Sequence, residues 1–359
     1  MSSSSKSVAA AHSESARVAN LYRVAIVGGA TLKGKEVAEV LTERSFPVVD
    51  VKLLDDDESL GQLEAVQDEI TFIQSVRAEQ FENLDFTFFA SDPECTRRNW
   101  QAAQKAGSAI VDLSFALEAE ASARVRSPWI ERQLGLPLMP ELQPAPAVTA
   151  HSAAVVLALL LLRAQKAGKI EQAVATVLEP ASEHGQKGMD ELHEQTVNLL
   201  SFQPLPKRIF DTQVAFNLVN RYGEQSVPAL ASVQERIFRH YRQIAGQEAP
   251  QVSLLLVQAP IFHGHSFALC LQMREAADLA GLAQALAGEH ITLAQSGEEA
   301  PSNVNAAGRD DISVSIAGDA TNARACWLWA AADNLRIAAR NAVECAESMA
   351  ATRPKGSVQ

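Results

Sequence analysis

A strand followed by a glycine-rich turn and a helix is the feature that most constrains how this chain can fold. Residues 23–27 (Arg-Val-Ala-Ile-Val) have the pattern of a buried strand, residues 28–34 form the turn, and residues 35–41 carry apolar side chains at helical spacing. Strand, turn and helix make up the first half of a βαβ unit, which joins parallel strands. The sequence therefore predicts an α/β fold whose first sheet is parallel.

The same alternation of strand and helix continues to residue 113. Strand patterns occupy residues 48–54, 86–90 and 109–113, and residues 97–106 have a helical pattern between the last two strands. Alternating α and β segments are typical of a doubly wound sheet with helices on both faces. We therefore predict a Rossmann-type domain for the first part of the chain.

In the second half of the chain, strand and helix patterns no longer alternate regularly, and this predicts an α+β domain. Five prolines in residues 118–148 indicate that the intervening segment is mostly loop. A C-terminal helical pattern at 327–349 is expected to fold back on the first domain. The other predicted elements are an apolar helix at 153–162, strands at 174–178, 253–258 and 267–273, and helices at 192–200 and 233–243.

Charge and cysteine content exclude several kinds of partner. The 359 residues carry a formal net charge of −12, which disfavours nucleic acid and anionic lipid. The cysteines have no CxxC spacing, so we expect neither a metal site nor a disulfide framework, and reduced thiols indicate a cytoplasmic protein. They are Cys95, Cys270, Cys326 and Cys345.

Neither the N-terminus nor the most apolar stretch predicts contact with a membrane. Residues 1–21 are rich in serine and alanine and lack the apolar core of a secretory signal, so we expect a disordered tail. Residues 153–162 cover only half of the ~20 residues that a bilayer-spanning helix needs. A buried helix explains this stretch.

Four stretches taken together resemble the aspartate-semialdehyde dehydrogenase family, and within it the divergent Usg-like members. Their order and separations fit the family over nearly the whole chain from about residue 22. The stretches are the glycine turn at 28–34, Ser-Glu-His-Gly-Gln-Lys-Gly-Met-Asp-Glu-Leu at 182–192, Pro-Ile-Phe-His-Gly-His-Ser at 260–266 and Trp-Ala-Ala-Ala-Asp-Asn-Leu-Arg at 329–336.

The resemblance implies a domain organisation and an activity. Residues 22–152 and 328–352 would form the dinucleotide-binding domain, residues 153–327 a dimerisation and former substrate domain, and residues 353–359 a tail. The family reaction is the reductive dephosphorylation of aspartyl phosphate: a thiolate forms an acyl-enzyme, NADPH supplies hydride and phosphate leaves. A homodimer is expected, and a heterodimer with an active paralogue is an alternative.

Three of the four catalytic positions that the resemblance implies are altered here. Ser152 stands in place of the nucleophilic cysteine, Gln258 in place of an arginine that holds the substrate carboxylate, and Glu179 in place of a substrate-orienting glutamine. A serine at a helix N-terminus needs a base, because the helix dipole is too weak to ionise it. Loss of a bidentate arginine costs on the order of several kcal/mol in binding an anion.

The fourth position keeps the family's catalytic histidine as His265, which has two interpretations. Paired with Ser152, it would make a weak hydrolase; alone, it is a retained packing or hydrogen-bonding residue. We favour the second interpretation, because the sequence identifies no carboxylate that could orient His265.

The resemblance in the glycine turn implies which residues would bind the cofactor. Thr31 replaces the middle glycine of the family pattern, which narrows the approach to a pyrophosphate, and a positive φ at a threonine would be costly. Lys33 either supplies compensating charge or points to solvent, and we favour solvent. The cofactor-binding set is Gly28, Ala30, Thr31, Leu32, Lys33 and Gly34, together with Asp55.

An acidic run follows the second predicted strand. The arginine that the family uses for the 2′-phosphate of NADP is Glu58 here, and Asp55, Asp56 and Asp57 precede it. Four negative charges repel a phosphate and disfavour NADP, whereas Asp55 could accept a hydrogen bond from the ribose 2′-hydroxyl of NAD. A solvated acidic loop is the equal alternative. An arginine of the family's phosphate loop is likewise acidic, as Glu118.

Three functions remain. We favour a member without dehydrogenase activity that is kept for binding, regulation or assembly, because the losses coincide at the reaction centre. The second is an NAD-dependent oxidoreductase that uses His265 on an aldehyde or oxo group with altered specificity. The third, least favoured, is an esterase that uses Ser152 and His265.

Overall fold

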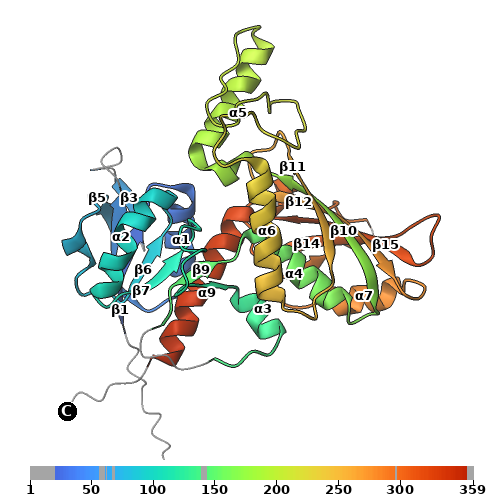
Figure 1. Cartoon of the computed structure of the whole chain (residues 1–359), viewed down its shortest axis with the longest axis horizontal. Helices are drawn as coiled ribbons and strands as arrows, with labels where there is room; N and C mark the ends of the chain where they lie inside the picture. The colour runs from blue at the N-terminus through green and yellow to red at the C-terminus, as the bar shows by residue number, and fades with distance from the viewer. Residues whose placement is uncertain are drawn as a thin grey trace, which may run out of the picture.

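Two large sheets, each with helices packed on it, make up most of the described part of the chain (Figure 1). Helix α9 (Asn334–Thr352) runs between the two parts. The predicted tails, apart from Leu21 and Arg353, lie outside the described residues. The computed structural model describes residues 21–55, 61, 63–66, 69–138, 144–295 and 297–353.

The first sheet is parallel throughout and confirms the predicted doubly wound arrangement. Alternation along the interior strand β1 (Tyr22–Val27) sends Val24 and Ile26 toward one face and Ala25 and Val27 toward the other. Helix α1 (Leu32–Glu43) and α9 pack on the first face, and α2 (Pro93–Lys105) packs on the second. In sheet order the strands are β5 (Gln74–Ser75), β2 (Val48–Asp55), β1 (Tyr22–Val27), β6 (Phe86–Phe89), β7 (Ala109–Asp112), β9 (Ala147–Thr149) and β8 (Arg124–Arg126).

The second sheet is mixed and forms the other domain. One face is covered by α4 (Ser152–Ala164), with α6 (Leu230–Ala245) and α7 (Leu279–Leu286) beside it. In sheet order the strands are β11 (Val252–Gln258), β10 (Ile170–Glu179), β12 (His265–Met273), β15 (Ala325–Ala332), β14 (Ile312–Gly318) and β13 (Ile291–Leu293).

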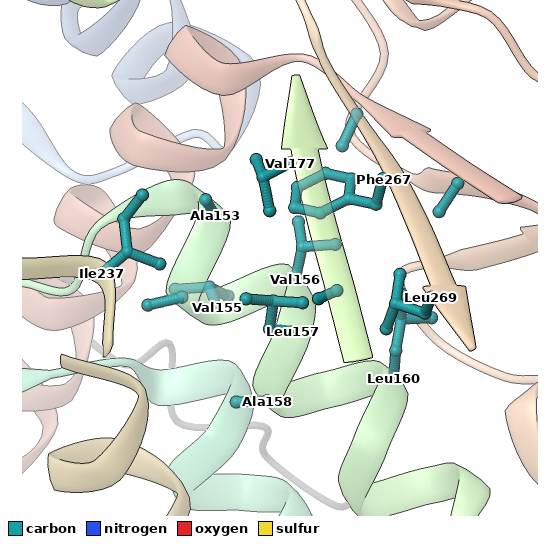
Figure 2. Packing of buried hydrophobic residues seen from close by; sticks show 14 of the residues in the cluster. Ala153, Val155, Val156, Leu157, Ala158, Leu160, Val177, Ile237, Phe267 and Leu269 are labelled. Atoms are coloured by element: carbon teal, nitrogen blue, oxygen red, sulfur yellow. The ribbon is translucent and has the colours of Figure 1, made fainter. Parts of the chain in front are cut away.

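Helix α4 is buried around its whole circumference, as its continuous apolar sequence predicts. Figure 2 shows Val156 and Leu160 on the side that faces the sheet, where Val177 of β10 and Phe267 of β12 lie, and Ile237 of α6 on another side. Interiors of this kind are close-packed, so the helix cannot shift without disrupting the core. The core therefore fixes the position of the N-terminus of α4.

The remaining elements are short or project from the body. Helix α5 (Gly185–Leu200) extends beyond the second sheet, at the top of Figure 1. The others are α3 (Pro128–Gln133), α8 (Asn303–Ala306), the 3₁₀ helices η2 (Ala78–Phe81) and η3 (Ala181–His184), and a two-stranded sheet of β3 (Leu63–Val66) and β4 (Glu69–Phe72).

Two sequence predictions differ from the structure. The helical pattern predicted for 327–349 begins with a strand: β15 ends at Ala332 and places residues 328–332 in the second sheet, so only α9 returns to the first. Trp327 and Trp329 have the two-residue period of a strand, and the small apolar residues that follow fit either element. The proline-rich segment 118–148 contains α3, β8 and the start of β9 as well as loop.

No helix in the described ranges is long and apolar enough to cross a membrane. The apolar stretch 153–162 lies within α4, as predicted, and is a core helix of the second domain.

Candidate functional site

The predicted nucleophile position lies where the first sheet joins α4. Strand β9 ends at Thr149 and α4 begins at Ser152, so Ser152 lies beyond the carboxyl end of a parallel strand and at a helix N-terminus. Doubly wound folds bind their ligands at this edge of the sheet. His151 caps the helix, because its Nδ1 accepts a hydrogen bond from the N–H of Ala153 over 3.3 Å.

Ser152 is bonded to a carboxylate and not to a histidine. Its Oγ donates to Oε1 of Glu183 over 3.4 Å, and among the described residues it makes no hydrogen bond to His265. A serine hydroxyl becomes nucleophilic when a base withdraws its proton along such a bond. The pairing that the esterase interpretation needs is therefore not formed.

Two carboxylates flank His265, although the sequence revealed none. Nε2 of His265 lies 3.7 Å from Oε2 of Glu179 and 3.9 Å from Oε1 of Glu183. Oε2 of Glu183 is also 3.7 Å from Nε2 of His151. These separations are longer than hydrogen bonds. The sequence identified no carboxylate that could orient His265, and the structure places Glu179 and Glu183 beside it.

The two carboxyl groups differ in pKa. Glu179 is fully buried, and burial, with the charge of Glu183 in addition, raises its pKa. Burial also opposes the ionisation of Glu183, but His151 and Lys33 lower its pKa overall. Because His151 accepts through Nδ1, its Nε2 carries the proton and turns an N–H toward Glu183. The pKa of Glu183 is thus shifted down, to about 2, and that of Glu179 is shifted up.

Glu118 and His240 support the turn that carries His151. The N–H of His151 donates to Nδ1 of His240 over 3.0 Å, and Nε2 of His240 lies 3.1 Å from Oε2 of Glu118. Glu118 also pairs with Arg236 and Arg239. Burial opposes its ionisation, yet these partners lower the pKa of Glu118 to about 2. The acidic residue that replaces a phosphate-loop arginine therefore joins α6 to the first domain.

Gln258 is held by three hydrogen bonds. Its Oε1 accepts from the Tyr222 hydroxyl over 2.6 Å, and its Nε2 donates to the carbonyl oxygens of Glu179 and Ala259 over 3.0 and 2.8 Å. The side chain is fully buried. Burial raises the pKa of Tyr222, which keeps the hydroxyl a donor. A neutral amide whose polar atoms are already paired cannot clamp a carboxylate as a guanidinium does.

The glycine turn has the geometry of a dinucleotide-binding turn at both of its ends. Gly28 has φ +88°, and a Cβ there would lie 2.5 Å from the backbone of Ser91; a Cβ at Gly34 would lie 2.0 Å from a carbonyl oxygen. Both positions therefore require glycine. Thr31 has φ −72°, so the costly conformation does not arise; its Oγ1 instead caps α1, which begins at Leu32.

Lys33 does not point to solvent, contrary to the interpretation that we favoured. Its Nζ lies 3.5 Å from the carbonyl oxygen of Leu113 and 4.8 Å from the centre of the Phe115 ring. The same ring stacks on His151, with centroids 5.6 Å apart, and lies 5.0 Å from the guanidinium of Arg236. Phe115 thus stands between the glycine turn and the reaction centre.

Asp55, at the end of β2, faces the glycine turn. Its Oδ2 accepts a hydrogen bond from the N–H of Ala30 over 2.9 Å, and the residue is buried. Asp55 is therefore not part of a solvated loop, and its position is one from which an acidic residue can accept from a ribose hydroxyl. The rest of the acidic run, Asp56, Asp57 and Glu58, lies outside the described residues.

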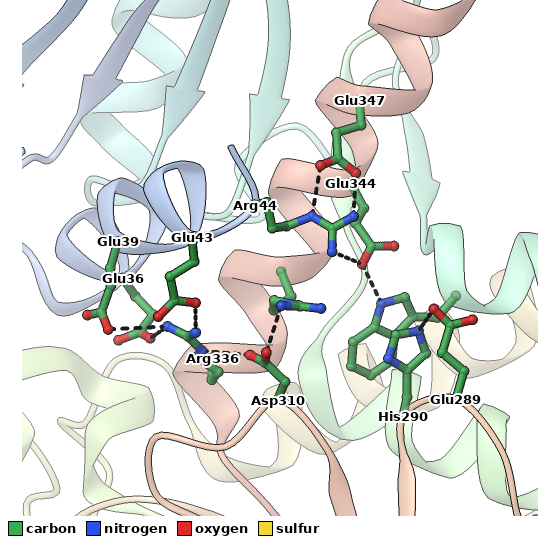
Figure 3. Close-up of polar contacts among 12 residues, drawn as sticks. Glu36, Glu39, Glu43, Arg44, Glu289, His290, Asp310, Arg336, Glu344 and Glu347 are labelled. Atoms are coloured by element: carbon green, nitrogen blue, oxygen red, sulfur yellow. Dashed lines mark hydrogen bonds and ion pairs between the residues drawn. The ribbon is translucent and has the colours of Figure 1, made fainter. Parts of the chain in front are cut away.

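Ion pairs connect α1 to α9 and to the second domain (Figure 3). Arg336, on α9, is 5% exposed and is surrounded by carboxylates of α1 and of the loop before β14. Two residues earlier on α9, Nδ2 of Asn334 donates to Glu183 over 2.9 Å. Neighbouring residues of α9 therefore touch both the glycine-turn helix and the reaction centre. The carboxylate partners of Arg336 are Glu36, Glu39, Glu43 and Asp310.

None of the four cysteines, all of them in described segments, supplies a thiol at the position of Ser152. Cys270 follows His265 on β12 by an odd number of residues, so the two side chains point to opposite faces of the sheet. Cys345 lies about three turns of α9 beyond Asn334. Burial raises the pKa of every one of these thiols. Cys95 and Cys326 lie on α2 and β15.

Three members of the cluster were not identified from the sequence: His151, Glu183 and Asn334. Glu183 follows Glu179 by four residues, but β10 ends at Glu179 and Pro180 turns the chain into η3. That turn brings both carboxylates to one centre. The signal available in the sequence was a glutamate at the end of a buried strand, followed by a proline and then by a second glutamate four residues after the first.

Two protein-family models match the chain. Residues 23–159 match the model described as semialdehyde dehydrogenase, NAD binding domain. Residues 145–337 match the one described as semialdehyde dehydrogenase, dimerisation domain. The two matches overlap at α4, where the candidate site lies.

Individual relatives match over both domains. The chain is 32% identical over 324 residues to the USG-1 protein homolog of Pseudomonas aeruginosa, covering 89% of this chain and 95% of that protein. It is 27% identical to the aspartate-semialdehyde dehydrogenase of Rickettsia conorii, with 91% and 97% covered. A solved structure titled as a probable aspartate-semialdehyde dehydrogenase from Pseudomonas aeruginosa matches with a TM-score of 0.82 and 30% identity, covering 91% and 98%.

Proposed function

Because the chain belongs to the aspartate-semialdehyde dehydrogenase family, we propose that it is a dimeric member without dehydrogenase activity that serves in binding, regulation or assembly. The observation that carries this proposal is Ser152, whose hydroxyl donates to Glu183 at the place of the nucleophilic thiolate. The lowered pKa of Glu183 makes it a weak base, so it holds the proton of Ser152 without removing it. A thioester cannot form on a serine.

The substrate side of the site supports the same proposal. Gln258 is neutral and fully hydrogen-bonded, so it offers no charge to a substrate carboxylate. An acyl phosphate entering beside Ser152 would instead meet the ionised carboxylate of Glu183. Burying like charges together is strongly unfavourable. Nucleophile and substrate clamp are thus lost at one place.

Formation of an acyl-enzyme tests this proposal. The protein is incubated with acetyl phosphate, and released phosphate and intact mass are followed over time. We expect neither a phosphate burst nor an acetyl adduct from the natural chain, with Ser152→Ala as the matched blank. A burst from the natural chain that Ser152→Ala abolishes would overturn the proposal.

An NAD-dependent oxidoreductase is the second candidate, and the position of Asp55 favours it. Asp55 is buried beside the glycine turn and next to Ala30, where it can meet a ribose. Thermal unfolding with NAD, NADH, NADP and NADPH separates the candidates, because ligand at a hundredfold above Kd adds about 2.7 kcal/mol to the free energy of unfolding. A shift with NAD or NADH alone would support an oxidoreductase; no shift with any of the four would exclude it.

We further propose that the homodimer forms through the open face of the second sheet. Four large apolar side chains, between 37% and 47% exposed, lie on the face opposite α4. The register places Val174 in one row with Trp327 and Leu255 in the next row with Trp329. Cys270 lies between the first two residues, and Thr176 and Ala268 lie between the second two. Several large apolar side chains exposed on one sheet face are typical of a protein interface. The matched dimerisation-domain model spans all four residues.

Sedimentation velocity tests the dimer. We expect the natural chain to sediment as a dimer and the double variant Trp327→Glu/Trp329→Glu as a monomer, while Val49→Glu, an exposed position on β2, leaves the dimer intact. A natural chain that is monomeric alone and dimeric only after mixing with an active paralogue would favour the heterodimer.

A further inference from the structure

The reaction centre holds buried polar atoms that have no hydrogen-bond partner in the described chain. Both carboxylate oxygens of Glu179 and Nε2 of His265 have no hydrogen-bond partner there, and the two residues are 0% and 1% exposed. Both side chains converge, with Glu183, on one point: Nε2 of His265 lies 3.7 Å from one carboxylate and 3.9 Å from the other. Buried polar groups are rarely left unpaired, and each such case requires an explanation.

We propose that this centre binds a small organic cation through a primary ammonium group. An ammonium offers three N–H donors and no acceptor, which complements two carboxylates and an imidazole nitrogen. The inference rests on the proposed function, since a centre used for acyl phosphate chemistry would have to accept an anion. It adds to that function the chemical class of the ligand.

Within the described residues, the ion-pair contacts of both carboxylates are with histidines: His265 beside Glu179, and His151 and His265 beside Glu183. Neither Glu179 nor Glu183 forms an ion pair with a lysine or arginine in the described segments. The ammonium of Lys33 is directed to the carbonyl oxygen of Leu113 and to the ring of Phe115. Gln258 is neutral and already paired. The carboxylates therefore remain available to a cation from outside.

The carboxylate of Glu183 is already held in place by two hydrogen bonds. Oε1 of Glu183 accepts from Nδ2 of Asn334 over 2.9 Å and from Oγ of Ser152 over 3.4 Å. Asn334 is itself fixed, because its Oδ1 accepts from Ser182 and from the N–H of Gly264, both over 3.1 Å. A side chain oriented in advance binds a ligand with less loss of entropy. Ser152 thus becomes a positioning residue for Glu183.

The spacing of the acceptors suits a nitrogen better than a metal ion. A nitrogen can lie ~2.9 Å from each of two acceptors that are 3.7–3.9 Å apart. Zinc, at ~2.1 Å from its ligands, would be forced to an angle wider than tetrahedral by the same separations. No group of three or more His, Cys, Asp or Glu in the described ranges has the geometry of a metal site.

Calorimetric titration with ethylammonium chloride tests the inference, with sodium propionate as the matched anion. We expect saturable binding of ethylammonium and none of propionate. Glu179→Gln and Glu183→Gln, which keep the side-chain shape, should each weaken binding at least tenfold, whereas Glu235→Gln, on the exposed side of α6, should leave it unchanged. Circular dichroism confirms that each variant is folded.

Proton release distinguishes ligand binding from a merely structural role. Burial raises the pKa of Glu179, and an ammonium paired with this carboxylate would lower that pKa, so binding should release protons in the pH interval between the two pKa values. Titrations in buffers of different ionisation enthalpy measure this release. This release should disappear in Glu179→Gln. Binding that is unaltered in both glutamine variants, or the absence of binding to the folded natural chain, would overturn the inference.

Two further outcomes separate this inference from the proposed function. Saturable binding of Zn²⁺ or Mn²⁺ at the same residues, without binding of ethylammonium, would replace the organic cation by a metal. Absence of ammonium binding together with absence of acyl transfer would defeat the inference alone, whereas acyl transfer by the natural chain would defeat the proposed function as well.

Discussion

The single residues that carry the proposed function are fixed by their hydrogen bonds as well as by their identity. Ser152 is bonded to Glu183, and Gln258 has no free polar atom, so restoring one residue type would not restore its environment. The replacements could be predicted from the sequence, because each stands in a recognisable stretch. The environment could not, because Glu183 reaches the centre through the turn at Pro180 and is held by Asn334 of the distant α9.

The buried Tyr222 hydroxyl should contribute measurably to stability. Tyr222→Phe leaves Oε1 of Gln258 without its donor in the core, and such a loss lowers the free energy of unfolding by about 1–3 kcal/mol. Urea denaturation measures the change. Tyr22→Phe is the control, because the Tyr22 hydroxyl makes no hydrogen bond within the described chain, and equal effects of the two variants would contradict the assignment.

At the scale of elements, the glycine turn also supplies the N-cap of helix α1, through Thr31. Strand, turn and helix were predictable from residue pattern, since Gly28 and Gly34 occupy positions where a Cβ would collide with backbone. The N-cap role of Thr31 was not predictable, because a threonine at the position of a family glycine first suggests backbone strain. Its negative φ shows that Thr31 takes an ordinary N-cap conformation.

Removing this cap should destabilise α1. Thr31→Ala deletes the oxygen that accepts from the N–H of Gly34 over 3.0 Å and should cost about 0.5–2 kcal/mol, whereas Thr31→Ser keeps the acceptor. Thermal and urea unfolding of the three proteins measure this order. A serine variant as unstable as the alanine variant would show that the methyl group, and not the cap, matters.

The stability that Glu118 contributes through its contacts with Arg236, Arg239 and His240 of α6 should depend on pH. Its pKa is lowered from 4.5 to about 2, so its interactions stabilise the fold fully above pH 4.5 and are lost as pH falls from 4.5 through 2. The difference in free energy of unfolding between the natural chain and Glu118→Gln should therefore shrink steadily over that interval. A difference that stays constant from pH 6 to about 2 would contradict this role.

At the scale of the whole molecule, α9 holds the two domains together. The doubly wound domain and the second sheet follow from strand and helix patterns, but the start of α9 does not, because Trp327–Ala332 pairs with β12 and β14 through contacts distant in sequence. Local pattern cannot distinguish a buried alanine-rich strand from a helix. The charges that fasten α9 to α1 are likewise separated by some three hundred residues.

Loss of Arg336 should loosen this junction. The Arg336 side chain is buried, but the carboxylates around it are 22% to 63% exposed, so water can solvate them in Arg336→Met, and we expect a cost of about 1–3 kcal/mol. Arg208→Met, which removes an exposed pair with Glu194, should cost less than about 1 kcal/mol. Hydrogen exchange should rise in α1 and in the first turns of α9 in the first variant only; unchanged exchange there would contradict the role of the network.

The central claim is that an intact dehydrogenase fold here lacks dehydrogenase chemistry. Its most direct test is phosphate-dependent reduction of NAD or NADP by the purified protein with aspartate semialdehyde, followed by absorbance and compared with Ser152→Ala. The claim predicts the same rate for both proteins, indistinguishable from a reaction without protein. Turnover by the natural chain that the alanine variant loses would contradict it.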